Sequence, residues 1–221
     1  MKKTLIAIVA LAGVAMGAGD SLTLSTAPLY NGTEGGSYAG IAFTLGADDS
    51  SRFTMTEGEL TELVTLTSIS LTERGGNYNF PDDRVLYITN TDKLYLGSSA
   101  IYTKAEGSDV AVFDFANSIT LNTNTTYYAY IIDSNSVASW EAGVTKVAAG
   151  QFYSAPLAAV GGSLTGSTAA NWGFLNKDGL ASTGFAPMMS ITVSNINVPE
   201  PTTATLSLLA LAGLAARRRR R

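Results

Sequence analysis

The chain has neither cysteine nor histidine among its 221 residues. Without cysteine, disulfide bonds are excluded as a source of stability, whatever the redox state of the compartment. Without histidine, Ser-His-Asp triads, Cys-His dyads, the usual zinc sites and the His-Glu-x-x-His metalloproteases are excluded, because each of them needs an imidazole.

Positive charge is also scarce, and half of it lies at the two ends of the chain. Residues 21–198 contain seven basic and 16 acidic residues, which gives this stretch a formal charge of −9. Binding to nucleic acid requires a basic face, so a nucleic-acid partner is not expected. The stretch is long enough for one domain with a substantial core, and two domains are not indicated.

The N-terminus has the three consecutive features of a secretory signal. Lys2 and Lys3 form a basic region, residues 5–15 are apolar, and small residues follow at 17–19. This order is typical of a signal peptide that is removed on export. We predict a signal peptide over residues 1–19 and a mature chain that begins near Ala18 or Asp20.

The C-terminus combines a short motif, an apolar run and a basic end. Residues 202–216 carry no charge, and as a helix they would extend about 22 Å, less than the ~30 Å hydrocarbon core of a bilayer. We predict a linker and motif over 195–201, a hydrophobic helix that enters the membrane over 202–216, and a basic cytoplasmic stop over 217–221. The motif consists of Val198, Pro199, Glu200 and Pro201, and the stop consists of Arg217, Arg218, Arg219, Arg220 and Arg221.

This tail resembles the PEP-CTERM sorting signals of bacterial surface proteins. The resemblance rests on residues 198–201, the apolar run 204–216 and the terminal arginines. It implies recognition by a membrane-embedded exosortase, which cuts near the motif and releases or transfers the protein into the envelope or an extracellular polysaccharide matrix. The resemblance covers only about 24 residues, so it addresses the destination of the protein and not the activity of the remaining chain.

Between the two terminal signals, the sequence predicts an all-β domain over residues 20–194. Short runs rich in β-branched and aromatic residues alternate with Gly, Asn, Asp and Ser clusters about every ten residues, as in a sandwich of antiparallel strands. We expect a single β-sandwich of the jelly-roll type. The predicted strands are 38–45, 53–55, 60–71, 85–88, 94–96, 110–115, 126–132, 151–153 and 188–193.

Four local features refine this prediction. Residues 126–132 are apolar on both faces, which predicts a central strand. The apolar phase slips within 60–71, so we expect a bulge near Thr67 and Ser68. Residues 155–184 are rich in Gly, Ala and Ser, and we predict long loops around Trp172. The threonines of the chain show no common repeat, so they are expected at ordinary solvent-facing strand positions.

Aromatic residues in predicted loops are candidates for stacking on sugar rings. Tyr78, Trp140 and Trp172 lie beside Gly, Asn or Ser, and an exported protein that binds glycans uses such rings together with Asn and Asp. The alternative is that both tryptophans close the ends of the core. Tyr87, Tyr128 and Tyr130 lie in predicted strands, where core packing is expected.

Carboxylate clusters offer two further kinds of site. Asp48, Asp49, Asp82 and Asp83 lie in predicted loops whose oxygens could supply part of a calcium shell, although none matches an EF-hand. We therefore expect no required cofactor, and calcium is the one for which the sequence offers candidate ligands. Glycosidases work with two acids and no histidine, so a carboxylate-based hydrolase stays as the alternative function.

Together these features predict an exported cell-surface or matrix protein with a non-catalytic role, either structural or glycan-binding. The expected partners are an exosortase, the membrane by way of the C-terminal helix, and a polysaccharide.

Overall fold

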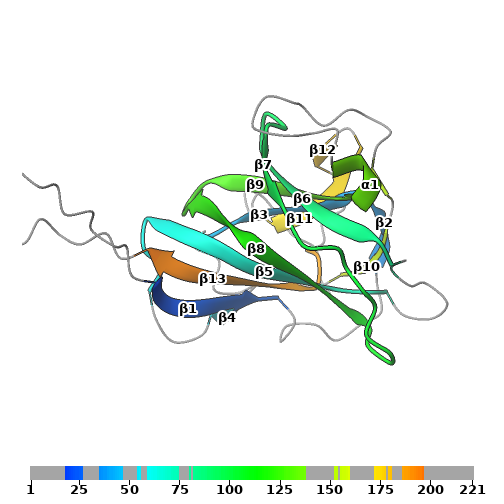
Figure 1. Cartoon of the computed structure of the whole chain (residues 1–221), viewed down its shortest axis with the longest axis horizontal. Helices are drawn as coiled ribbons and strands as arrows, with labels where there is room; N and C mark the ends of the chain where they lie inside the picture. Colours follow the sequence, from blue (N-terminus) through cyan, green and yellow to red (C-terminus); the bar gives the residue numbers. More distant parts are fainter. Residues whose placement is uncertain are drawn as a thin grey trace, which may run out of the picture. The chain divides into compact units, whose positions relative to one another are not determined.

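The structure is a computed structural model of the chain, and it describes residues 18–26, 35–46, 54–55, 59–74, 80, 82–137, 152–153, 155–159, 172–177, 179–180 and 186–196. These residues form an all-β fold of antiparallel sheets, which confirms the predicted fold class (Figure 1). The elements are β1 (Ala18–Ser25), β2 (Gly35–Tyr38), β3 (Gly40–Thr44), β4 (Thr54–Met55), β5 (Leu63–Thr72), β6 (Arg84–Asn90), β7 (Tyr95–Ser98), β8 (Val110–Asn122), β9 (Thr126–Asp133), α1 (Ser134–Val137), β10 (Ala155–Ala158), β11 (Trp172–Asn176), β12 (Gly179–Leu180) and β13 (Met189–Ile196).

Two larger sheets organise the fold. One has five strands in the order β4-β1-β13-β5-β8, and the other has six in the order β12-β11-β3-β9-β6-β7. A two-stranded sheet, β10-β2, accompanies them. The predicted central strand is confirmed, because β9 lies between β3 and β6. Residues Gly19–Asn195 form one compact unit.

The side-chain period of two explains how β5 presents different faces to the core and to solvent. Val64, Leu66, Ile69 and Leu71 are buried, and the residues between them are more exposed. The ladder to β8 shifts register between Leu66 and Ser68, and the ladder to β13 shifts opposite the same point. The predicted bulge is therefore confirmed at Thr67: one extra residue returns the aliphatic side chains to the core face.

A shared core connects the two larger sheets. Inward side chains of β1, β5, β8 and β13 belong to the same buried cluster as those of β3, β6, β9 and β11. Full burial of a Leu, Ile or Phe side chain contributes about 1.5–3 kcal/mol, so this cluster is the main source of stability. Phe113 lies at one of its aromatic centres, with ring centroids 5.9 Å from Phe80 and 5.3 Å from Tyr102.

The structure corrects the loops predicted over residues 155–184. Three strands, β10, β11 and β12, form within this range, although its composition is poor in β-branched residues. Tertiary contacts outweigh propensity here, because β11 pairs with β3 and its first four residues are buried.

The first and last strands overlap the segments predicted on either side of the domain. β13 extends to Ile196, two residues into the range predicted as linker. The amide of Asn195 explains this extension: its oxygen accepts the backbone N–H of Thr61 at 3.0 Å, and its nitrogen donates to the carbonyl of Glu59 at 2.8 Å. At the other end, β1 begins at Ala18, inside the predicted signal peptide.

Candidate functional site

Several predicted site residues lie outside the described residues and stay predictions. These are the aromatic candidates Tyr78 and Trp140, the loop acids Asp48 and Asp49, the motif residues Val198, Pro199, Glu200 and Pro201, and the arginines 217–221.

Trp172 is the one aromatic candidate that the structure describes, and its predicted loop position was wrong. It is the first residue of β11, opposite Phe43 of β3, and its side chain is only 1% exposed. The ring belongs to the core shared by the two larger sheets. Stacking on a sugar needs an exposed ring face, and Trp172 in this position presents none.

Asp82 and Asp83 lie in the turn that precedes β6, as predicted, and both are exposed. Asp82 Oδ1 accepts the backbone N–H of Lys104 at 2.8 Å, and Asp83 Oδ1 pairs with Arg84 Nη1 at 2.8 Å. Asp83 has φ of 68°, a conformation that aspartate tolerates in turns. In the part of the chain that the structure describes, no three His, Cys, Asp or Glu residues cluster as metal ligands would. Calcium binding stays a prediction.

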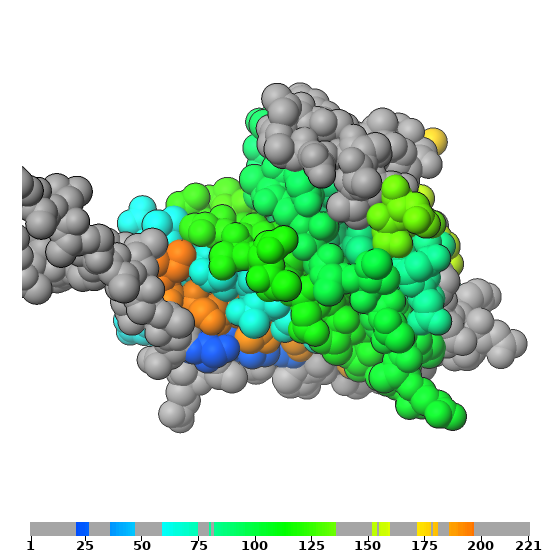
Figure 2. Space-filling model, in the orientation of Figure 1, coloured from blue at the N-terminus to red at the C-terminus, as the bar shows by residue number. Residues whose placement is uncertain are grey.

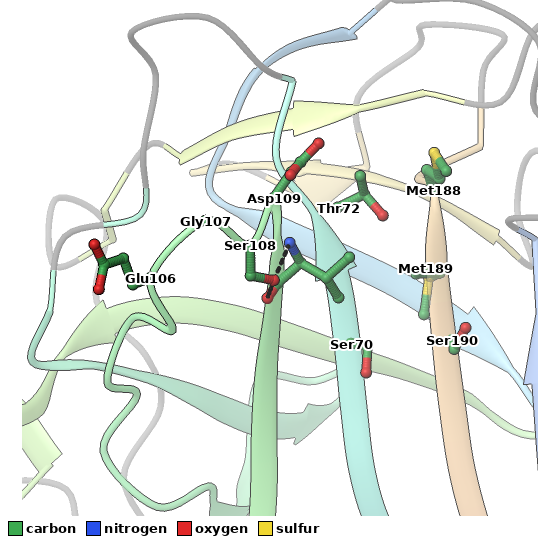
Figure 3. A pocket seen from close by; sticks show the side chains of 10 residues that line it. Ser70, Thr72, Glu106, Gly107, Ser108, Asp109, Met188, Met189 and Ser190 are labelled. Carbon is green, nitrogen blue, oxygen red and sulfur yellow. Dashed lines mark hydrogen bonds between the residues drawn. The ribbon is translucent and has the colours of Figure 1, made fainter.

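An open groove of about 520 Å³ lies where β5, β13 and the loop before β8 meet (Figure 3). Hydroxyl groups come from the strands and from Ser108 of the loop, whereas both carboxylates come from the loop. The lining consists of Ser70 and Thr72 of β5, Met188, Met189 and Ser190 at β13, and Glu106, Gly107, Ser108, Asp109 and Val110.

Backbone hydrogen bonds position both walls of the groove against β5. The N–H of Thr72 donates to the carbonyl of Met188 at 3.0 Å, and the N–H of Glu73 donates to the carbonyl of Asp109 at 2.7 Å. In the loop, Gly107 adopts φ of 74° and Ser108 N–H donates to the Ala105 carbonyl at 3.2 Å. This tight turn brings Glu106 and Asp109 to the groove.

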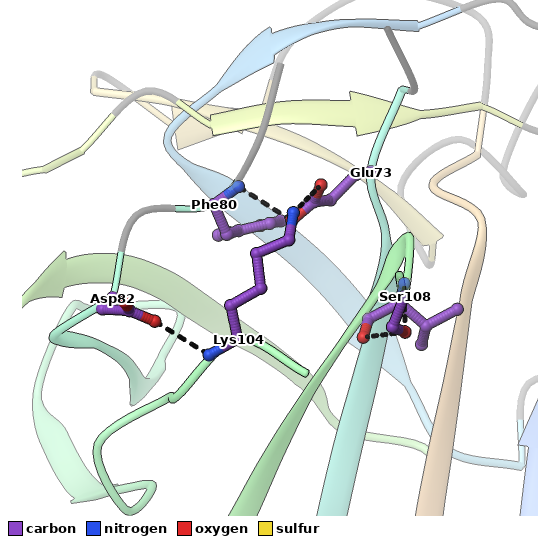
Figure 4. Close-up of polar contacts among 6 residues, drawn as sticks. Glu73, Phe80, Asp82, Lys104 and Ser108 are labelled. Carbon is purple, nitrogen blue, oxygen red and sulfur yellow. Dashed lines mark hydrogen bonds and ion pairs between the residues drawn. The ribbon is translucent and has the colours of Figure 1, made fainter. Parts of the chain in front are cut away.

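A buried ion pair stabilises the loop that carries Glu106 and Asp109 (Figure 4). The side chain of Glu73 is 2% exposed, and its Oε2 lies 3.1 Å from Lys104 Nζ. Its Oε1 also accepts the backbone N–H of Phe80 at 2.8 Å. Because a buried charge without partners is costly, these contacts constrain the segment that leads into Glu106 and Asp109. The nearby phenol of Tyr102 has a raised pKa, first because it is buried and then because Glu73 and Asp82 are close.

The chemistry of the groove suits a neutral, hydroxyl-rich ligand. Glu106 and Asp109 line it without any basic residue, so the lining disfavours anions. Carboxylates accept strong hydrogen bonds from hydroxyl groups, and Ser and Thr both donate and accept. Val110 and Met188 supply an apolar surface for C–H groups. Sequence reasoning missed this site, because nothing in the linear pattern connects residues 106–110 with 70–72 and 188–190.

A second aromatic cluster packs on the six-stranded sheet, away from the shared core. Tyr87 stacks on Tyr95 with ring centroids 4.4 Å apart, and Tyr130 stacks on Phe152 at 4.3 Å. Tyr87 and Tyr130 are fully buried, and burial raises the pKa of both phenols. Core packing of these two strand tyrosines is therefore confirmed, whereas Tyr128 is only partly buried.

Comparison with known proteins identifies the tail. Residues 197–221 match the model of the PEP-CTERM protein-sorting motif. The chain carries a PEP-CTERM sorting signal. This finding confirms the resemblance noted in the sequence and supports an exported, envelope-associated protein that an exosortase processes. No curated protein and no solved structure matches the chain. Among the described residues, no helix is long and apolar enough to cross a membrane.

Proposed function

We propose that the exported PEP-CTERM protein is a non-catalytic, polysaccharide-binding component of the cell envelope. The observation that carries this proposal is the open groove between β5, β13 and the loop before β8. It combines hydroxyls, two carboxylates and apolar side chains on a domain that the sorting tail delivers to the envelope.

The strand order supports a jelly-roll architecture for this domain. A jelly roll winds eight strands, here numbered 1 to 8, into two four-stranded sheets with the orders 1-8-3-6 and 2-7-4-5. The five-stranded sheet contains β1-β13-β5-β8, and the six-stranded sheet contains β3-β9-β6-β7. When these eight strands are numbered 1 to 8 along the chain, the two sheets have the orders 1-8-3-6 and 2-7-4-5. The remaining strands are additions: β4, β11 and β12 lie at the sheet edges, and β10 pairs separately with β2. Jelly rolls are frequent among proteins that bind sugars, an analogy of fold that adds to the argument from the groove.

The sorting tail also bears on where the protein resides. We propose that the apolar run 202–216 holds the precursor in the membrane until the exosortase acts, and that Arg217 to Arg221 stay on the cytoplasmic side. Replacement of Glu200 with alanine should then leave an uncut precursor in the membrane pellet after carbonate extraction. Recovery of the precursor in the soluble fraction would contradict this.

Binding can be tested directly with the full-length chain purified in mild detergent. We expect it to migrate more slowly in gels that contain a recognised neutral polysaccharide and to bind fragments of that polymer on a glycan array. Asp109→Asn removes one charge-assisted acceptor while leaving the backbone bond to Glu73 in place. Loss of about 1–1.5 kcal/mol corresponds to affinity that is roughly 5- to 12-fold weaker.

Asp92→Asn is the matched control. Asp92 is exposed in the turn after β6 and does not line the groove, yet its replacement changes the net charge equally. Equal effects of the two substitutions, or no binding to any glycan on the array, would refute the proposed function.

The alternative function, a carboxylate-based glycoside hydrolase, gains one observation, since Glu106 and Asp109 line the same groove. A hydrolase would turn over a chromogenic glycoside, and Glu106→Gln or Asp109→Asn would abolish turnover while leaving substrate binding largely intact. A binding protein would show no turnover, and the same substitutions would weaken its affinity.

A further inference from the structure

The outer face of the five-stranded sheet carries an ordered array of hydroxyl groups. Serine and threonine alternate with buried aliphatic residues along β1, β5 and β13, so the hydroxyls share the face that points away from the core. Over residues 21–25, 64–72 and 189–195, the outward side chains include no charged residue. The array consists of Ser21, Thr23 and Ser25 on β1, Ser190, Thr192 and Ser194 on β13, and Thr65, Ser68, Ser70 and Thr72 on β5.

Strand register aligns these hydroxyls into rows across the sheet. Ser190 lies opposite Ser70, Thr192 opposite Ser68, and Ser194 opposite Thr65. The rows extend to β1, because Ser190 Oγ is 2.8 Å from Ser25 Oγ and Thr192 Oγ1 is 3.1 Å from Thr23 Oγ1. Neighbouring strands are about 4.8 Å apart, and alternate residues are about 6.6 Å apart along a strand. The result is a regular grid.

The neighbouring strand β8 borders this grid with two valines and one exposed carboxylate, Asp114, which lies opposite Ser68. Val112 lies opposite Ser70 and Val110 opposite Thr72, and they are 46% and 39% exposed. Figure 2 shows parts of β1, β13, β5 and β8 at the surface on one side of the molecule, in blue, orange, cyan and green. Ser70, Thr72, Ser190 and Val110 also line the groove, so groove and grid form one continuous surface.

We propose that the outer face of β1, β13, β5 and β8 is a platform for an extended chain of neutral polysaccharide, one end of which enters the groove. This inference rests on the proposed function and extends its site from the groove to the whole face. Hydroxyls of the grid exchange hydrogen bonds with those of the polymer, and Val110 and Val112 pack against the C–H faces of its rings.

The charge and the residue composition of this face determine which kind of ligand it can bind. The domain is strongly acidic, the hydroxyl rows are uncharged, and the one charged residue of the bordering strand β8 is the acidic Asp114, so an anionic polymer is repelled and a neutral one is not. A protein partner is disfavoured, since the grid lacks the Trp, Tyr and Arg side chains that dominate binding energy in protein interfaces.

The test measures how strongly the full-length protein binds long and short glycans. The probes are insoluble cellulose, chitin and starch, the trisaccharides of the same polymers, and alginate as an anionic control. We expect at least one neutral polymer to retain the chain far more strongly than its trisaccharide does, and alginate not to retain it. Ser68→Glu lies in the grid outside the groove lining and should weaken polymer binding about tenfold while changing trisaccharide binding less than twofold. Asp109→Asn in the groove should weaken both.

Thr103→Glu, at an exposed loop position, is the control for added charge, and Ser68→Ala replaces Ser68→Glu if the latter does not fold. If Ser68→Glu leaves polymer binding unchanged while Asp109→Asn weakens it, the platform is refuted and the groove function survives. If no glycan of any length binds, the proposed function itself fails. If Ser68→Glu instead abolishes self-association in sedimentation and spares glycan binding, the face is a protein interface and the inference is overturned.

Discussion

Replacement of Lys104 with methionine removes the cationic partner of a buried carboxylate while keeping most of the apolar length of the side chain. Glu73 is 2% exposed and would retain the backbone N–H of Phe80 as a hydrogen-bond donor. Loss of one partner of a buried pair costs about 3–5 kcal/mol. Lys104 is 26% exposed, so solvent already weakens the pair, and we expect a cost of about 3 kcal/mol, at the lower end of this range.

The expected result is measurable by thermal and urea unfolding. For a domain of this size, each kcal/mol lowers the melting temperature by about 2–4 °C, so Lys104→Met should lower it by roughly 6–12 °C. Lys177→Met is the matched control, because Lys177 is exposed and its side chain makes no ion pair with the residues that the structure describes. That substitution should change stability by less than about 0.5 kcal/mol.

A double-mutant cycle that combines Lys104→Met with Glu73→Gln measures the coupling energy between the two side chains. Glutamine can still accept the N–H of Phe80, and it leaves Lys104 able to reach solvent, so this substitution alone should cost less than Lys104→Met. The double variant contains no buried charge, and we expect it to be more stable than Lys104→Met alone. A coupling energy near zero, or equal costs for Lys104→Met and Lys177→Met, would show that the pair does not stabilise the loop behind the groove.

Four further outcomes are expected. Tyr130→Phe should raise stability by about 1 kcal/mol in urea unfolding, because the buried Tyr130 hydroxyl has no hydrogen-bond partner in the described part of the chain. Gly40→Ala should lower stability by more than about 3 kcal/mol, since its Cβ would collide with the backbone carbonyl of Ala129 in the paired strand β9. Hydrogen bonds from Asn135, followed by Arg84, lower the pKa of Asp133, so its contribution to stability is present above pH 3.8 and disappears as pH falls through the lower folded-state pKa. Asp133→Asn should therefore lower stability slightly at neutral pH, leave it nearly unchanged below the folded-state pKa, and so flatten the acid limb of a stability profile. Addition of calcium or of a chelator should leave the melting temperature unchanged, and a calcium-dependent rise would instead show that the folded protein binds calcium.

The all-β class and most of the principal strands could be predicted because they depend on local patterns. The alternation of hydroxyl and aliphatic residues in β5 encodes which face is buried, and its slip at Thr67 encodes the bulge. The strand β11 could not be predicted, because Trp172 and its neighbours become a strand through pairing with β3, which lies more than 120 residues earlier in the chain. Pairing with a strand so distant along the chain leaves no periodic pattern in the sequence of β11 itself.

The candidate site, like β11, depends on strand pairing and could not be predicted from local sequence patterns. Neither Ser70 nor Ser190 is distinctive in sequence, and the threonines have no linear repeat. Their hydroxyls form rows only because antiparallel register places residues from β1, β5 and β13 side by side. Glu106 and Asp109 likewise reach the groove through hydrogen bonds to elements that are distant along the chain.

The sequence by itself determined the destination of this protein and the class of its fold. A sorting signal is recognised as a linear segment, and β-structure follows from a period of two, so neither requires knowledge of the tertiary contacts. Only the tertiary structure decided that Trp172 is buried, which carboxylates share a groove and which hydroxyls form a grid. Each of these depends on the pairing of strands far apart in sequence, and such pairing is set by the packing of the whole core.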